Sequence, residues 1–388
     1  MRSVRTIPVL KNIPVIVRVA MNVPVENGVV MNDYRLRRAV PTLTFLSSRG
    51  ARVILVSHIG EKGTETLEPV AKALGKRIPR VSFFPETIGP RVRDAIRAMV
   101  PGDVLVLENL RRDKREQAND LSFAKELAML GDVFVEDSFD TCHRKHASIV
   151  SLPKLLPSYA GLQLEDEVTE LRLALKPKHP SLAVIGGAKF STKEGLLSLL
   201  LSTYDKLFVG GALANDFLKA KGHEVGKSLV SAGDTSGIQA LLADEKLVLP
   251  LDVVVVPASV IGTPEQQTKA RVVSVEGVRP DESILDHGPA TEALLTSLAK
   301  DAKTILWNGP LGNYENGFVS GTDAFARAVA KSGARSVVGG GDTVASIESL
   351  GLLPKFSFVS TGGGAMLDFL ADGSLPGIDA LDNTHLSS

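Results

Sequence analysis

Short apolar runs recur along the whole chain, and each ends in a polar or glycine-rich turn. Six of them lie in the second half, at 183–193, 207–215, 253–259, 304–312, 336–343 and 356–364. Four more lie in the first half, at 15–22, 52–60, 103–111 and 132–140. Runs of this length that are closed by turn residues are typical of buried strands in a parallel sheet.

Amphipathic stretches separate these runs and predict helices. The stretch 35–50, which closes on a glycine, is one of them. Strands that alternate with helices over most of a chain indicate an α/β protein with parallel sheets. A chain of 388 residues is too long for one ordinary core, so we expect two domains.

The boundary between the two domains is expected within 158–180. This segment is interpreted as one charged helix that ends at Pro177. We therefore expect a first domain, a linker helix and a second domain over 1–160, 161–178 and 179–375. Periodicity does not show where the polar tail, 376–388, docks, and the first domain is a candidate.

Composition narrows the classes of ligand and location. Lys plus Arg and Asp plus Glu both number 44, so the chain has no overall positive charge that would attract nucleic acid. Aromatic residues make up only 5%, which also argues against surfaces on which bases could stack. A single cysteine, Cys142, excludes an internal disulfide and a cysteine-cluster metal site. The most apolar stretch, 247–262, is too short and too interrupted to span a membrane. No apolar signal core follows the N-terminus, so the expected location is cytoplasmic.

Glycines and charges gather where the strands of the second half end. Ligands of open parallel sheets bind at that edge, where glycines let backbone N–H groups approach phosphate oxygens. Lys189, Lys193 and Asp342 lie in these turns. Two cations and a carboxylate suit a magnesium nucleotide. Taken singly, the lysines could form a solvated helix face and Asp342 could be a helix N-cap.

The corresponding turns of the first half suit a different ligand. They carry Asn22, Arg35, His58, Arg111, His143 and Arg144. Such residues favour an anionic ligand that is not a nucleotide.

Three weaker signals favour structural interpretations. The G-K-S at 226–228 has one residue too few after Gly222 for a P-loop, so it is interpreted as a turn. His143 and His146 lack a second ligand pair, which makes a zinc site improbable. Trp307 is expected to be a packing residue.

Taken in order, the motifs resemble those of the phosphoglycerate kinase family. The second half carries GGAKFSTK, GGALANDFLK, WNGPLGNYE, GGGDT and STGGGA, and the first half carries RVAMNVP, SHIG, ENLR and TCHRKHAS. The resemblance covers about 15–380. It implies two similar-sized doubly wound parallel-sheet domains joined by a helix and hinge. It also implies transfer of a phosphoryl group between ATP or ADP, with Mg²⁺, and the carboxylate of a small acid in a commonly monomeric enzyme.

The resemblance also implies roles for single residues. On the nucleotide side Lys189 and Lys193 would contact phosphates, Asp342 would hold magnesium and Glu315 would bind the ribose. The phosphate track would be lined by Gly211, Asn308, Gly309, Gly340, Gly341 and Thr343. Arg35, with Lys189 and Gly341, would act on the transferring group. The acidic substrate would be bound by Asn22, His58, Arg111 and Arg144.

The acidic-substrate motifs depart from the family pattern. Where the family has R-V-D-F-N, this chain has Ala20 and Met21, so the aspartate expected to bind the substrate's 2-hydroxyl is missing. Glu61 replaces the arginine of S-H-L-G-R-P, which is expected to pair with the 3-phosphate. The other substitutions in these motifs are Arg112, Glu136, Ser138 and Asp140.

These departures predict a carboxylate kinase of this family whose acceptor differs from 3-phosphoglycerate. Removing one charge-assisted contact typically costs about 1.5–3 kcal/mol, and a carboxylate near a phosphate adds repulsion. Two alternatives stay open. In an ordinary phosphoglycerate kinase, Lys62 or Arg112 would replace the lost arginine. A non-catalytic homologue would bind nucleotide without turnover.

Overall fold

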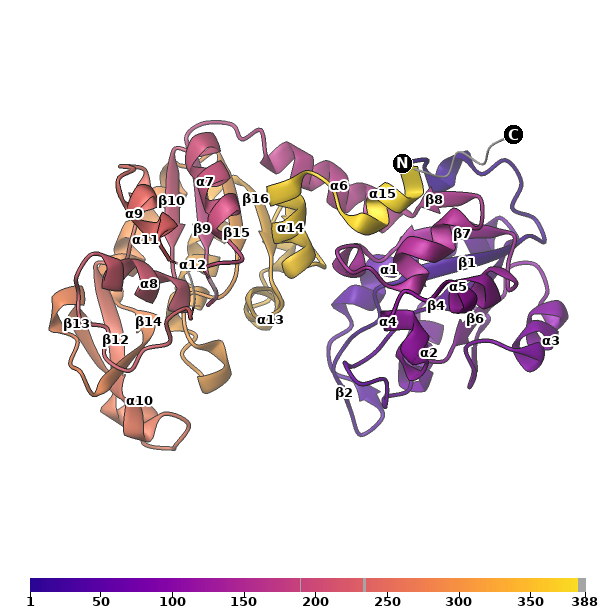
Figure 1. Cartoon of the computed structure of the whole chain (residues 1–388), viewed down its shortest axis with the longest axis horizontal. Coiled ribbons are helices and arrows are strands. Elements are labelled where there is room, and N and C mark those ends of the chain that lie inside the picture. Colours follow the sequence, from indigo (N-terminus) through magenta and orange to yellow (C-terminus); the bar gives the residue numbers. More distant parts are fainter. Residues whose placement is uncertain (189, 233–234, 383–388) are drawn as a thin grey trace. The chain divides into compact units, whose positions relative to one another are not determined.

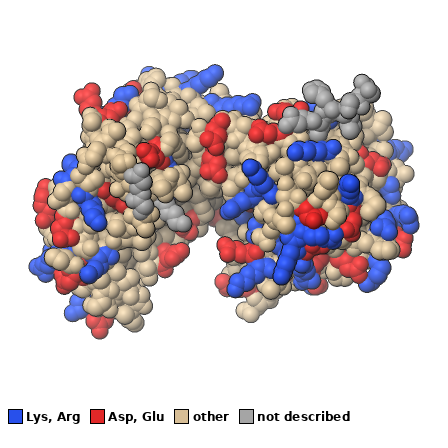
Figure 2. Space-filling model, in the orientation of Figure 1, with Lys and Arg blue, Asp and Glu red and all other residues tan. Residues whose placement is uncertain are grey.

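The computed structural model divides the chain into two units, each built around a six-stranded parallel sheet (Figure 1). The structure describes residues 1–188, 190–232 and 235–382. The first unit comprises Met1–Thr169 and the chain from Asp372 onward, and the second comprises Glu170–Ala371. Both acidic and basic side chains lie on the visible face of each unit (Figure 2).

The first unit has the strand order β5-β6-β4-β1-β7-β8, and all neighbours are parallel. These strands are β1 (Pro14–Val19), β4 (Arg52–Val56), β5 (Val81–Phe84), β6 (Val104–Leu107), β7 (Val133–Asp137) and β8 (Ser158–Ala160). Since they are parallel, their carboxyl ends share one edge. Val19 of β1 is paired with Asp137 of β7, which brings the turns after these two strands together.

Helices cover this sheet because their apolar residues recur every three or four positions. In α1 (Tyr34–Ser48) the side chains of Leu36, Ala39, Leu43 and Leu46 are buried, which confirms the helix predicted at 35–50. The shorter α-helices of this unit are α2 (Glu68–Gly75), α3 (Pro90–Ala98), α4 (Lys114–Gln117), α5 (Leu121–Ala128) and α15 (Pro376–Asp382). A two-residue hairpin pair, β2 (Val25–Glu26) and β3 (Val29–Val30), precedes α1.

The second unit has the strand order β11-β10-β9-β15-β16-β17, again parallel throughout. Its strands are β9 (Ser181–Ile185), β10 (Lys206–Val209), β11 (Leu247–Val248), β15 (Thr304–Asn308), β16 (Arg335–Gly339) and β17 (Phe358–Val359). Its longer helices are α7 (Glu194–Thr203), α8 (Ala212–Ala220), α9 (Gly237–Leu242), α11 (Pro289–Asp301), α12 (Ser320–Ser332), α13 (Gly341–Ser349) and α14 (Gly364–Asp372). Five of the six runs predicted as parallel strands in this half are confirmed.

The sixth run, 253–259, was predicted to be parallel, and that prediction is wrong. It forms β12 (Asp252–Pro257), the centre of an antiparallel sheet with β13 (Arg271–Ser274) and β14 (Glu282–His287). A four-valine run shows that a strand is buried but not which way its partners run. Here Val253 and Val255 pack into a small core of their own, beside α8.

The charged segment expected to be one helix over 158–180 is divided. Its first residues form β8, and the helix itself is α6 (Leu162–Ala174), which spans the border of the two units along the chain. The carboxylate of Asp137 caps the amino end of α6, because its Oδ1 accepts the backbone N–H groups of Gln163 at 2.9 Å and Leu164 at 3.2 Å.

The end of the chain is anchored in the first unit. In α15 the backbone N–H of Gly377 donates to the carbonyl of Cys142 at 2.8 Å. A Cβ at position 377 would lie 2.8 Å from the Ile149 side chain, so glycine permits this close contact. No helix within the described ranges is long and apolar enough to cross a membrane.

Candidate functional site

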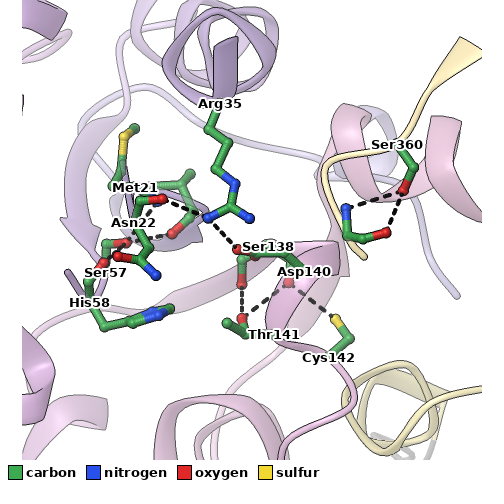
Figure 3. A network of polar contacts seen from close by, with 12 residues as sticks. Met21, Asn22, Arg35, Ser57, His58, Ser138, Asp140, Thr141, Cys142 and Ser360 are labelled. Atoms are coloured by element: carbon green, nitrogen blue, oxygen red, sulfur yellow. Dashed lines mark hydrogen bonds and ion pairs between the residues drawn. The ribbon is translucent and has the colours of Figure 1, made fainter. Parts of the chain in front are cut away.

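The turn after β1 lies at the sheet edge of the first unit where the sequence predicts the acidic-substrate site. The carbonyl of Asn22 accepts the Arg35 Nη1 at 2.6 Å, and its side-chain Oδ1 accepts the N–H of Gly60 at 2.9 Å. Figure 3 shows the guanidinium of Arg35 pointing toward this turn from α1. Asn22 thus ties together three segments that the sequence assigned to one site.

Arg35 also has an acidic neighbour. Its Nη1 lies 3.4 Å from Oδ2 of Asp140, in the short turn Phe139–Thr141 that follows β7 (Figure 3). The Asp140 side chain is 6% exposed, whereas that of Arg35 is 27% exposed. Since the buried member of a pair is poorly screened by solvent, this ion pair is stronger than a surface pair. This pairing could not be predicted from the sequence.

His58, at the end of β4, is held in one tautomer by a buried arginine. Its Nδ1 lies 3.0 Å from Nη2 of Arg18. A guanidinium only donates, so Nδ1 accepts and the ring proton resides on Nε2. Burial, and then the charges of Arg18 and Arg111, lower the pKa of His58 well below its usual value. His58 is therefore a neutral N–H donor.

Arg18 lies at the centre of a buried polar network. Its side chain is fully buried and donates to the Ser148 Oγ at 3.2 Å and the Val19 carbonyl at 2.7 Å. Burial raises the pKa of Glu136 to about 7, although the charge of Arg18 opposes this rise. Burial likewise raises the pKa of Glu116, which accepts the Ser148 hydroxyl at 2.6 Å.

Arg111 and Arg144 supply further positive charge near His58. The Arg111 Nη1 donates to the carbonyl of Gly60 at 2.7 Å. Burial, and then the charges of Arg18 and Arg144, lower the pKa of Arg111, while the charge of Glu61 acts in the opposite direction. Arg144 and Glu61 are exposed.

Some of the positions that depart from the family pattern lie away from the arginines of the first unit, and others lie beside them. Met21 is fully buried in the hydrophobic core, and Ala20 is 4% exposed. Arg112 is directed to Glu108, with its Nη1 3.0 Å from the buried Oε2 of that residue. Because the positive charge of Arg112 is paired with Glu108, Arg112 is a poor replacement for the arginine that is expected to bind the 3-phosphate. Glu61 and Asp140 lie beside the arginines of the site.

The histidines near Cys142 do not form a metal site in the described chain. No cluster of three or more His, Cys, Asp or Glu side chains there has the geometry to hold an ion. Burial, and then the charge of Arg111, lower the pKa of His146 to about 4.

A cavity of about 550 Å³ opens at the sheet edge of the second unit. Among its lining residues are Gly187, Gly211, Leu285, Asn313, Glu315 and Asp342. The size and the mixture of apolar walls and few polar groups are typical of a small-molecule site. The sequence had assigned Gly211, Glu315 and Asp342 to such a site.

The glycines of this edge permit close approach of its turns. Gly309, after β15, has φ +93°, and Gly340, after β16, has φ +103°. A Cβ on Gly309 would lie 2.7 Å from the backbone of Gly186, and one on Gly340 would lie 3.1 Å from the Gly309 N. Larger residues would therefore separate the turns after β9, β15 and β16.

Asp342 and Thr343 begin α13 at this edge. Gly340 is the N-cap and no side chain caps the helix, so the alternative reading of Asp342 as an N-cap is wrong. Partial desolvation, and then the charge of Glu315, raise the pKa of Asp342. The Thr343 side chain is fully buried, and its Oγ1 has no hydrogen-bond partner among the described residues.

The other residues that the sequence predicted near this edge differ in their contacts. A Cβ on Gly187, which lines the cavity, would lie 3.5 Å from Nζ of Lys193, so this ammonium lies close to Gly187. Asn308 is buried, and its Nδ2 donates to the carbonyl of Gly363 at 3.3 Å. Lys189 lies outside the described residues. Trp307 packs edge-to-face on Phe325, as predicted.

Comparison with known proteins gives one consistent answer. The family model described as phosphoglycerate kinase matches residues 5–373. The chain is similar to phosphoglycerate kinases of Roseiflexus castenholzii (43% identity, 95% of this chain and 96% of the relative) and Pelotomaculum thermopropionicum (42% identity, 98% of each). The chain belongs to the phosphoglycerate kinase family.

Solved phosphoglycerate kinase structures agree with this membership. The enzyme of Coxiella burnetii matches at 39% identity with a TM-score of 0.79, and that of Pyrococcus horikoshii at 28% identity with a TM-score of 0.87. Each comparison covers 98% of both chains. As a phosphoglycerate kinase family member, the protein is a phosphotransferase that acts on a carboxyl group.

Sequence reasoning missed two groups of residues in this phosphoglycerate kinase fold. Asp286 and His287 line the cavity, and burial raises the pKa of Asp286 to about 7 and lowers that of His287 to about 4. Both lie on β14, a strand that the apolar pattern did not predict. Arg18 was missed because a charged residue inside a strand gives no sign that it is buried.

Proposed function

We propose that this protein transfers the γ-phosphoryl group of magnesium ATP to the carboxylate of a small anionic acid other than 3-phosphoglycerate. The products are ADP and an acyl phosphate, and the reaction is reversible. One observation supports the proposal that the acceptor differs from 3-phosphoglycerate. Ala20 and Glu61 replace two expected substrate ligands, whereas Arg35, His58, Arg111 and Arg144 are retained at the same sheet edge.

The cavity of the second unit is the proposed nucleotide site. Asp342 and Glu315 are carboxylates close enough for one to raise the pKa of the other, which fits a bound cation. Magnesium bound there would neutralise phosphate charge. The hydroxyl of Thr343, which has no partner among the described residues, and the N-terminus of α13 suit a phosphate oxygen, and Lys193 adds a cation.

The first unit is proposed to bind and orient the acceptor. His58 presents a neutral Nε2–H that can donate to an acceptor oxygen, and Arg111 and Arg144 attract the acid. Arg35, fixed by the Asn22 carbonyl, is proposed to stabilise the charge of the transferring group. These residues act by positioning and charge, so no covalent intermediate on the protein is needed.

A second candidate is an ordinary phosphoglycerate kinase. Identities of 42–44% to phosphoglycerate kinases over at least 95% of the chain favour it. In that case the site would bind 3-phosphoglycerate with Lys62 in place of the lost arginine, since Arg112 is paired with Glu108.

The test is ADP formation from magnesium ATP with 3-phosphoglycerate and with a panel of small carboxylic acids. Hydroxylamine traps the acyl phosphate as a hydroxamate. Hydroxamate from another acid, with little from 3-phosphoglycerate, supports the proposal. Ordinary turnover of 3-phosphoglycerate supports the second candidate. Nucleotide binding without hydroxamate from any acid contradicts both and indicates a non-catalytic homologue.

A further inference from the structure

Two carboxylates lie beside the arginines of the acceptor edge. Asp140 pairs with Arg35 at 3.4 Å. Glu61 directly follows Gly60, whose carbonyl receives the Arg111 guanidinium at 2.7 Å, and its charge acts on Arg111. Each acid therefore reduces the positive potential that one arginine offers to an anionic ligand.

Asp140 has no evident role in building the fold. Its Oδ1 is buried and makes no hydrogen bond to any described residue, and its Oδ2 forms the ion pair with Arg35. Asp113 and Asp120 of the same unit each accept backbone N–H groups at a helix start. A buried carboxylate without such contacts is costly, so its charge points to a functional role.

We propose that Asp140 and Glu61 set the charge of the acceptor, and that this site takes a small monocarboxylic acid without a phosphate group. This inference rests on the proposed function. Among the arginines of this edge that are not fully buried, Arg35, Arg111 and Arg144 together with Asp140 and Glu61 leave about one positive charge, which matches one acceptor carboxylate. A phosphorylated acid would bring about two further negative charges beside Asp140 and Glu61, and the single charge of the neighbouring Lys62 would offset only part of them.

The reaction remains balanced with such an acceptor. An oxygen of the acceptor carboxylate forms a bond to the γ-phosphorus of ATP, and the bond from that phosphorus to the β-bridging oxygen breaks. ADP leaves with the electron pair. No proton is transferred, because the acid reacts as its carboxylate.

The experiment compares glycerate with 3-phosphoglycerate, which share a carbon skeleton and differ by the phosphate. The value of kcat/KM for each acid is measured by hydroxamate formation in the wild type and in E61R, D140N and E61R/D140N. D94N and D94R are matched controls, because Asp94 lies on α3 and is 70% exposed. Thermal unfolding of each variant checks its folding.

The wild type is expected to favour glycerate by at least about tenfold, and the double variant to shift this ratio by about a hundredfold toward 3-phosphoglycerate. If D140N does not fold, E61R alone is expected to give a shift of about tenfold. A wild type that favours 3-phosphoglycerate, or a ratio unmoved in E61R, overturns the inference while the proposed kinase activity stands. Hydroxamate from neither acid, nor from any acid of the wider panel, overturns both.

Discussion

The Nδ1 of His58 accepts a hydrogen bond from the fully buried Arg18, at 3.0 Å. This contact leaves the proton of the ring on Nε2, and burial with the arginine charges keeps the ring neutral. His58 is therefore a hydrogen-bond donor in this site and not a titrating acid.

The first prediction concerns His58→Asn, which replaces the ring donor with a shorter amide donor. We expect kcat/KM for the acceptor to fall about tenfold, because the amide does not reach as far. We also expect the ratio of wild-type to variant kcat/KM to stay constant between pH 6 and pH 8, because neutral His58 has already lost its second proton. A ratio that rises steadily below pH 7 would show a charged imidazolium at work and contradict this account.

The second prediction concerns Glu136, whose pKa burial raises from 4.5 to about 7. The native protein keeps this proton up to about pH 7, whereas the unfolded chain loses it near pH 4.5. Between these values the native state holds more protons, so rising pH lowers the free energy of unfolding.

Glu136→Gln removes this titration. The difference between the unfolding free energies of E136Q and the wild type should therefore increase by about 3 kcal/mol from pH 4 to pH 8, in favour of E136Q. Urea unfolding at several pH values measures it. Glu26→Gln, which removes an exposed carboxylate, is the control. Parallel curves for E136Q and wild type would refute the assignment.

The third prediction concerns Thr343→Val. The buried hydroxyl of Thr343 has no partner among the described residues, so a methyl in its place should leave unfolding free energy unchanged or raise it by up to about 1 kcal/mol. The same change should weaken ATP binding about fivefold, because a phosphate oxygen loses a donor. Titration calorimetry and urea unfolding test the two effects.

Thr291→Val is the matched control for Thr343→Val. The buried hydroxyl of Thr291 donates to the Asp252 carboxylate at 2.8 Å, so its loss should cost about 1–3 kcal/mol of stability and leave ATP affinity unchanged. Equal effects of the two variants on ATP binding would count against a phosphate at Thr343.

The fourth prediction concerns Asp342→Asn. Loss of this carboxylate should lower kcat at least about a hundredfold at a fixed, moderate magnesium concentration, and should raise the magnesium concentration needed for half-maximal rate. Asp323→Asn, on α12, is a control whose activity should stay within about twofold of wild type. An unchanged magnesium dependence in D342N would place the metal elsewhere.

Much of the fold was predictable because most of the parallel strands are short, largely apolar runs that end in a turn. The turns carry the ligand groups, so Asp342 could be placed at this edge from the pattern, whereas Glu315 and Gly211 were assigned to the same site through the family resemblance. Direction of pairing was not predictable for 253–259, since buried antiparallel and parallel strands can have the same apolar composition.

Contacts between distant charges could not be predicted. Arg35 and Asp140 are more than a hundred residues apart in the chain. They meet because β1 pairs with β7, and α1, which carries Arg35, follows β1 while the turn with Asp140 follows β7. The same holds for Arg112, whose pairing with Glu108 depends on the conformation of the turn after β6. The substitutions are visible in the sequence, but their partners are not.

The central claim is that this family member phosphorylates a carboxylic acid other than 3-phosphoglycerate. The most direct measurement is a single turnover with ATP labelled at the γ-phosphate, in which 3-phosphoglycerate and a panel of unphosphorylated small acids compete for the label. The account predicts that the trapped label is on an unphosphorylated acid. Label recovered chiefly from 3-phosphoglycerate would contradict it.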